Sequence, residues 1–68
     1  MNSRQLQYVV TLAEEKNFTK AAKRLIIAQP SLSQYISKLE NELGHTLFDR
    51  TTTPLRLTVA GELYVEMA

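Results

Sequence analysis

Residues 29–43, with the sequence QPSLSQYISKLENEL, carry an apolar face at the helical period, and this stretch constrains the fold more than any other. Leucine or isoleucine recurs there at steps of four, three and four, at Leu32, Ile36, Leu39 and Leu43. Such spacing predicts one amphipathic helix that packs its apolar side into a core.

The opposite face of the same helix is made of small and amide-bearing residues, namely Pro30, Ser33, Gln34, Ser37 and Asn41. Lys38 lies beside this face, and the helix has no acid before Glu40. Solvated helix faces usually mix Glu and Lys, so hydroxyls and amides suit a surface that hydrogen-bonds closely to a partner. Base edges in a DNA major groove are one such partner; a merely exposed polar face is about as compatible with these residues.

Two helical patterns precede this stretch. The first begins at a cap on Asn2 or Ser3, ends near Lys16, and has an apolar face of Leu6, Val9, Val10 and Ala13, with Tyr8 and Leu12 flanking. The second spans residues 18–25 after the N-cap Asn17, and its inner Ala21 and Ala22 allow close helix crossing. Residues 26–28 form a tight turn, so the pattern predicts a helix-turn-helix.

The period changes after Gly44, which suits a left-handed helix end. Segments 46–51 and 55–58 are rich in β-branched and apolar residues, and together they predict a hairpin with Pro54 at its tip or edge. Arg50 and Arg56 fall on its two arms. Three helices followed by such a hairpin predict a mainly α fold, the winged helix-turn-helix.

A last helix begins after the cap Thr58, and Val59, Leu63 and Met67, with Tyr64 near them, outline its apolar stripe. No Gly, Pro or polar cluster ends this helix before Ala68. We therefore expect a fragment cut inside a longer helix, whose exposed stripe requires a partner.

The formal net charge is only +1, but its distribution is uneven. Residues 16–38 contain five basic residues and no acid: Lys16, Lys20, Lys23, Arg24 and Lys38. A block of this kind is expected where one face meets phosphates. A solvated charge run explains it about equally well on charge alone.

Several functional classes are disfavoured by what the sequence lacks. Without cysteine there is no disulfide and no Cys-based zinc site, and the lone His45 is expected in a turn rather than at a metal. No second histidine or Gly-rich phosphate loop supports catalysis, so we expect no enzyme and no cofactor.

The apolar runs are too short for a membrane span and the N-terminus lacks a signal layout, which predicts a cytoplasmic protein. Tyr8, Tyr35 and Tyr64 are expected to pack with their hydroxyls in water.

The segments MNSRQLQYVVTLAEE, FTKAAKRL, AQPSLSQYISKLENELGHTLFDRT and LRLTVAGE together resemble the N-terminal DNA-binding domain of LysR-type transcriptional regulators. An AA pair, QP-x-LS, LE-x-ELG, LF-x-RT and LT-x-AGE in this order are highly specific. The resemblance implies a DNA-binding domain over residues 1–58 and the start of a linker and dimerisation helix over residues 59–68, with Val59, Leu63, Tyr64 and Met67 facing a second subunit.

The resemblance also implies the partners and the site. The partner is double-stranded DNA with an imperfect inverted repeat, bound by a homodimer that forms tetramers at full length. A small-molecule effector would bind a regulatory domain that these residues do not include. Residues expected against bases are Gln29, Pro30, Ser31, Ser33, Gln34 and Ser37; those expected at phosphates or on the wing are Thr19, Lys20, Lys38, Arg50, Thr53 and Arg56.

Four positions depart from the common pattern of that family. Ala28 replaces a frequent capping Ser, and Tyr35 stands where Gln is commoner. Gln34 stands where Arg is common, which favours adenine over guanine. Thr53 replaces a frequent wing-tip Arg. The remaining alternative is a winged helix used for protein contact or for nonspecific DNA binding.

Overall fold

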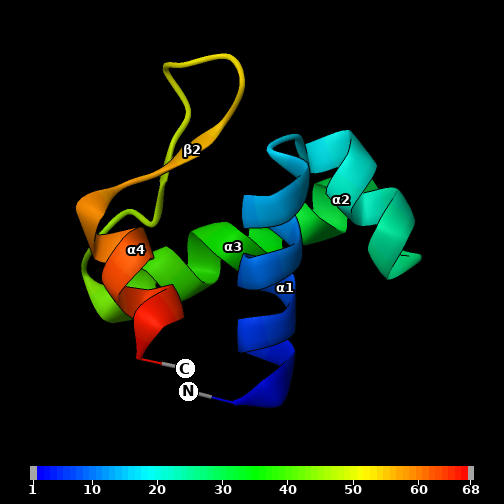
Figure 1. Cartoon of the computed structure of the whole chain (residues 1–68). Coiled ribbons are helices and arrows are strands. Elements are labelled where there is room, and N and C mark those ends of the chain that lie inside the picture. Colours follow the sequence, from blue (N-terminus) through cyan, green and yellow to red (C-terminus); the bar gives the residue numbers. More distant parts are fainter. Residues whose placement is uncertain (1, 68) are drawn as a thin grey trace.

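Four helices and a short hairpin follow one another in the computed structural model, which describes residues 2–67 (Figure 1). The elements in order are α1 (Ser3–Glu15), α2 (Phe18–Leu25), α3 (Gln29–Leu43), β1 (Phe48–Asp49), β2 (Arg56–Leu57) and α4 (Val59–Glu66). The hairpin projects away from the helices, and α3 crosses behind α1. This is the winged helix-turn-helix expected from the sequence, although residues 1 and 68, at the ends of the two expected domains, lie outside the described part.

The helix starts are closed by side chains, as the sequence predicts. The Asn2 side chain accepts a hydrogen bond from the Gln5 N–H at 2.8 Å, and the Gln5 side chain accepts one from the Asn2 N–H. Asn17 caps α2 in the same way, and Thr58 caps α4. Ala28 makes no such bond to α3, which confirms the weaker cap expected there.

Three helices end on residues with a left-handed backbone. Gly44 has φ of 76°, as predicted, and it ends α3. Lys16 and Ile26 have φ of 56° and 58° and end α1 and α2. A β-branched residue is strained in this conformation, and Ile26 is also 90% exposed.

The core forms where α1, α2, α3 and α4 meet, and it contains Val9, Leu12, Ala21, Ala22, Leu32, Ile36, Leu39, Leu47, Phe48, Leu55 and Tyr64. The expectation that Leu12 merely flanks the apolar face of α1 is wrong, because this side chain is fully buried. Since α1 packs against α2, α3 and α4, its buried face is wider than one stripe. Leu43 was expected in the inward apolar face of α3, but its side chain is exposed.

The hairpin is shorter than the expected segments 46–51 and 55–58. Its antiparallel strands pair Phe48 with Leu57 and Asp49 with Arg56. The ladder ends there because the chain turns after Asp49, which accepts a hydrogen bond from the Thr51 N–H at 2.9 Å. On the other strand, the N–H of Leu55 donates to the α1 end instead, at the Lys16 carbonyl oxygen (3.2 Å).

The fourth helix packs tightly against the chain that leads into β1. A Cβ at Gly61 would collide with the Leu47 carbonyl oxygen, so only glycine allows this approach. Tyr64 points into the core rather than beside the exposed stripe, and its hydroxyl has no partner in the described residues, contrary to the expectation of a hydroxyl in water. None of the helices in residues 2–67 has the length and apolar character of a membrane span.

Candidate nucleic-acid interface

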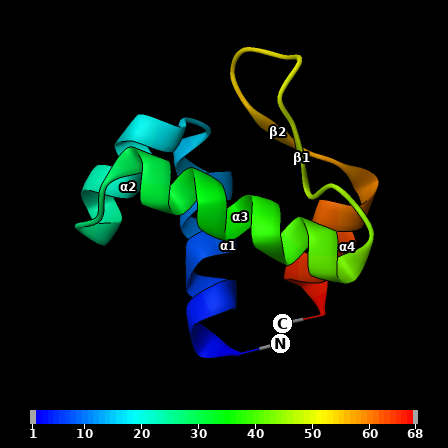
Figure 2. The same ribbon diagram turned by 180° about the vertical axis from the view of Figure 1, so that it is seen from behind.

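The polar face of α3 is the most exposed side of the helix and is open to a partner. Figure 2 shows α3 running across the front of the molecule between α2 and α4. Leu32, Ile36 and Leu39 are buried, whereas the opposite side of the helix carries the exposed or half-buried Pro30, Ser33, Gln34, Ser37 and Asn41. Gln29, which is half-buried, and Ser31, which is exposed, lie in the first turn on either side of this face. All six residues expected at bases are thus at least partly accessible, and four of them share the polar face.

Two edges of this face meet different surroundings. Ser37 lies on the edge toward the hairpin, where it lines a shallow groove together with Glu40 and Arg50. Lys38 lies on the other edge, in a small groove that it shares with Gln5 of α1 and Glu42 of α3. The wing side of the face is therefore distinct from the side that carries Lys38.

The first turn of α2 adds a second exposed group. Thr19 and Lys20 directly follow Phe18 and are both exposed. The Lys20 N–H donates to the Asn17 side chain at 2.9 Å, which fixes the backbone of this turn, while the ammonium makes no ion pair with any residue from 2 to 67. A helix start with a free cation suits an anionic partner.

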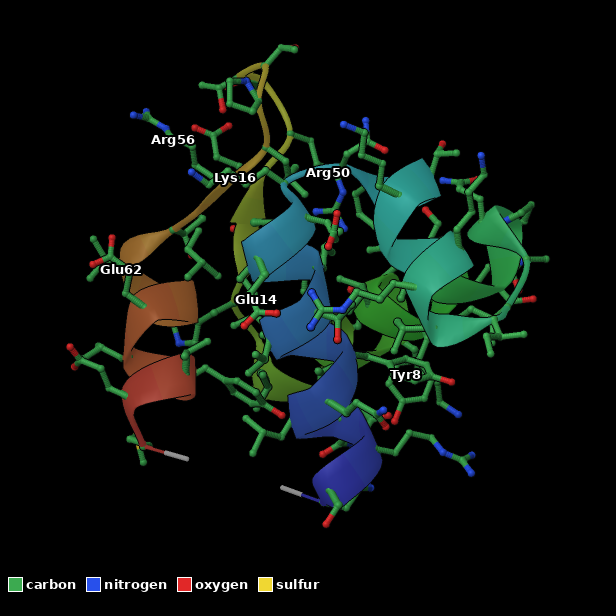
Figure 3. All side chains as sticks on the ribbon, turned by 45° about the vertical axis from the view of Figure 1, so that its right-hand side comes forward. Tyr8, Glu14, Lys16, Arg50, Arg56 and Glu62 are labelled. Carbon is green, nitrogen blue, oxygen red and sulfur yellow. The ribbon has the colours of Figure 1, made fainter. Side chains whose placement is uncertain are left out.

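The basic block is smaller than its sequence indicates, because Arg24 is neutralised. Its guanidinium lies 2.7 Å from Glu14 and 3.1 Å from Glu15 of α1, and Figure 3 shows Glu14 on the α1 side that faces away from α3. The hydrogen bond that Arg24 donates to the Glu14 carboxylate is the main cause that raises the pKa of Arg24. Within residues 2–67, the cations of the block without an ion pair are Lys16, Lys20, Lys23 and Lys38.

Arg50 sits between the hairpin and α2 (Figure 3) rather than in open solvent. Its Nη2 lies 3.1 Å from Oε1 of Glu40, and its guanidinium lies over the Phe18 ring at 5.3 Å. Glu40 is only 7% exposed and also accepts the backbone N–H of Leu47 at 2.6 Å. Glu40 was not among the site residues expected from the sequence, although an acid four residues after Ile36, on the edge of the apolar stripe, is a signal for it.

The outer part of the hairpin carries the other predicted wing residues. Arg56 and Thr53 are exposed, and Arg56 stands opposite Asp49 in the strand pairing. Hydrogen bonds from Thr51 lower the pKa of Asp49, the one from the hydroxyl more than the one from the N–H. Asp49 is therefore held as an anion beside Arg56, so the wing carries less net positive charge than its two arginines indicate.

Two tyrosines pack against each other, and the lone histidine lies in a turn. Tyr8 and Tyr35 pack against each other with ring centroids 4.6 Å apart and a tilt of 55°, which accounts for a tyrosine at position 35. His45 lies in the exposed turn after Gly44, as expected. Residues 2–67 contain no cluster of three side chains suited to a metal ion.

An apolar groove of about 780 Å³ opens between the end of α3 and α4, on a different side from the polar face of α3. Leu63 is 53% exposed and Met67 is 80% exposed, and both line this groove together with Leu43. Val59 is also exposed, so the predicted stripe on α4 is present except for Tyr64, which is buried.

Residues 3–62 match the family model for the bacterial regulatory helix-turn-helix protein, lysR family. This chain belongs to the lysR family. It is 52% identical over 68 residues to the HTH-type transcriptional regulator BudR of Klebsiella aerogenes and covers 48% of that protein. It is 50% identical to a probable cat1 operon transcriptional activator of Acinetobacter lwoffii, of which it covers 22%. The chain thus spans half or less of the length of these relatives.

A solved structure supports the fold of this lysR-family chain. The crystal structure of the BenM_DBD/benA site 1 DNA complex matches with a TM-score of 0.92 and 45% identity, over 98% of this chain and 75% of that one. The relatives BudR and the cat1 operon activator are transcriptional regulators. The four departures from the lysR pattern are therefore substitutions on a shared backbone and not signs of a different fold.

Proposed function

We propose that this chain binds double-stranded DNA in a sequence-specific manner, as the DNA-binding domain of a bacterial transcriptional regulator. In this proposal α3 lies in the major groove, and the hairpin lies on the flanking backbone or minor groove. One observation carries it: an exposed helix face of hydroxyls and amides, next to cations that make no ion pair in the described part of the chain, on a backbone similar to that of BenM_DBD in a DNA complex.

The roles divide between bases and phosphates, because phosphate contacts position a protein and base contacts specify sequence. The residues proposed to face bases are Gln29, Pro30, Ser31, Ser33, Gln34 and Ser37. Those proposed to face phosphates or the minor groove are Thr19, Lys20, Lys38, Arg50, Thr53 and Arg56. Gln34, exposed at the middle of the face, suits adenine, and a bidentate amide contact there is worth about 1 to 3 kcal/mol of discrimination.

The apolar stripe on α4 is the proposed site of self-association. We propose that residues 1–58 bind DNA and that residues 59–68 begin a linker helix, which pairs through Val59, Leu63 and Met67 with Tyr64 behind them. A dimer places two α3 helices about 34 Å apart, one DNA turn, and therefore suits an imperfect inverted repeat. Tetramers, and a small-molecule effector on a regulatory domain, belong to a longer protein of the kind that the relatives represent.

In this proposal the protein is not an enzyme, which fits relatives that are transcriptional regulators. It acts in the cytoplasm, where a bacterial chromosome is accessible. Protein contact alone is the weaker alternative, because Lys38 beside the polar α3 face and Lys20 on α2 are exposed and make no ion pair in residues 2–67.

Selection of bound duplexes from a random pool tests the proposal. The selected inverted repeat should outcompete a mixed-sequence duplex by at least about 10³ when the chain is dimeric. Gln34→Ala should relax the preference at one base position, whereas Asn41→Ala, which removes an exposed amide further along the same face, should leave the selected profile unchanged. Equal competition by both duplexes contradicts sequence-specific binding.

A further inference from the structure

We propose that Glu40 is a positioning residue for DNA binding, which holds Arg50 so that the free edge of its guanidinium faces a phosphate beside the start of α2. Glu40 itself touches no DNA in this proposal, and the inference rests on the proposed DNA binding. Three observations support it: the contacts of the carboxylate, the contacts of the guanidinium, and the place where the guanidinium lies.

The Glu40 carboxylate joins α3 to the base of the hairpin. Its Oε2 accepts the backbone N–H of Leu47 at 2.6 Å and that of Phe48 at 3.3 Å. Both carboxylate oxygens also meet the arginine, with Nη2 of Arg50 3.1 Å from Oε1 and Nη1 3.4 Å from Oε2. A buried carboxylate with this many donors has one orientation, because rotation would leave a charge unpaired.

The Arg50 guanidinium is held from two further sides. Its Cζ lies over the Phe18 ring, 5.3 Å from the centroid, and Nη1 lies 3.5 Å from the Phe48 carbonyl oxygen. The Arg50 side chain nevertheless remains 38% exposed, and its hydrogen bonds and ion pair in residues 2–67 involve Nη1 and Nη2, which leaves the Nε–H edge of its five donors for another partner. Arginine in such a fixed fork suits bidentate phosphate contact.

Arg50 also lies beside the start of α2. Phe18 begins α2, and Thr19 and Lys20, both exposed, follow it directly. Arg50 therefore lies against the same helix start that is proposed to bind phosphate, although it comes from the hairpin. Glu40 belongs to α3 and contacts both the base of the hairpin and Arg50, so one buried acid fixes the position of this arginine relative to α3.

This role predicts the opposite sign from simple electrostatics. An acid near DNA repels phosphates, so its removal alone should strengthen binding. A positioned arginine, in contrast, loses less side-chain freedom on binding, which corresponds to about two- to tenfold in affinity. Glu40→Gln keeps an oxygen for the Leu47 and Phe48 N–H groups and removes the charge that orients Arg50.

The test measures the affinity of the chain for a labelled mixed-sequence duplex by fluorescence anisotropy. The variants are Glu40→Gln, Arg50→Lys and the double variant, and Glu42→Gln serves as the control because it removes the same charge from an exposed site on α3. We expect Glu40→Gln to bind about two- to tenfold more weakly than Glu42→Gln. The double variant should bind within about twofold of Arg50→Lys, because Glu40 acts through Arg50.

Each other result overturns the inference. Binding by Glu40→Gln as tight as that by Glu42→Gln excludes a positioning role, and additive losses in the double variant assign Glu40 to stability alone. If circular dichroism shows that Glu40→Gln is unfolded, Phe18→Leu replaces it: this variant should weaken binding, with no further loss in an Arg50→Lys background, and unchanged affinity overturns the inference. A wild-type chain that binds no duplex overturns the proposed function as well, whereas a binding wild type isolates the failure to Glu40.

Discussion

At the scale of single residues, Asp49 shows how one side chain shapes the hairpin. Its carboxylate accepts the Thr51 hydroxyl and the Thr51 N–H, the latter at 2.9 Å, and the chain turns there. These hydrogen bonds, the one from the hydroxyl first, lower the pKa of Asp49. A carboxyl group whose pKa is lower in the folded state stabilises that state above its unfolded pKa, and this contribution is lost as pH falls through the folded pKa.

Thr51→Val should therefore raise the pKa of Asp49 toward its ordinary value, because the larger of the two lowering hydrogen bonds is removed. The stabilisation by Asp49 should then be lost at a higher pH during acidification. The measurement is a pH titration of the Asp49 carboxyl carbon by NMR. Thr52→Val is the matched control, since the Thr52 hydroxyl donates to the Pro54 carbonyl oxygen and not to Asp49; an equal shift in both variants contradicts the assignment.

At the scale of elements, the position of α4 depends on one close approach. Gly61 lies in the first turn of α4, and a Cβ there would meet the Leu47 carbonyl oxygen and the Leu57 side chain. The Thr58 hydroxyl adds a hydrogen bond of 2.7 Å to the Thr46 carbonyl oxygen, on the same side. The start of the helix therefore docks through backbone and small groups, whereas Tyr64 is its large side chain in the core and Val59, Leu63 and Met67 remain exposed.

Gly61→Ala should lower the free energy of unfolding by about 2 kcal/mol, because overpacking against backbone outweighs the usual gain in helix propensity. Gly44→Ala is the comparison, since a Cβ at Gly44 meets open space but its left-handed φ of 76° disfavours alanine; we expect a loss of about 1 kcal/mol. Urea unfolding measures both. A shift of the α4 resonances in Gly61→Ala alone supports the close approach, and an unchanged stability of this variant contradicts it.

At the scale of the whole molecule, ion pairs between elements determine which basic residues remain available to bind DNA. Arg24 is held by two glutamates and Arg50 by Glu40, whereas Lys20 makes no ion pair in the described part of the chain. Lys20→Ala should reduce the slope of log affinity against log salt by about 0.9, one phosphate contact. Arg24→Ala should leave this slope unchanged. Anisotropy titrations over a range of salt concentrations measure both, and equal reductions would show that Arg24 leaves its ion pairs to bind DNA.

The exposed stripe on α4 also acts at this scale. Leu63→Glu should weaken self-association at least about tenfold, because a charge would be buried in the proposed interface. Sedimentation equilibrium measures the change. Ile26→Glu is the control, since Ile26 is 90% exposed in the turn between α2 and α3, away from the stripe. Association that survives Leu63→Glu places the interface elsewhere.

The helices and their caps could be predicted from the local sequence. The bounds 18–25 and 29–43, the caps Asn17 and Thr58, and the left-handed Gly44 agree with the structure. These features depend on hydrogen bonds and backbone angles within a few residues, so local sequence contains the information. The exposed polar face of α3 followed in the same way, because the buried stripe places it on the opposite side.

Which charges are free and which side chains lie in the core depends on contacts between distant parts of the chain. The Arg24 pairs, the Glu40 contact with Arg50, and the burial of Leu12 and Tyr64 each join elements that are separate in the chain. The hairpin also shortened, because Leu55 bonds to the end of α1 instead of to the opposite strand. The physical reason is common to all of these: burial and ion pairing depend on distances across the fold, which periodicity along the chain does not contain.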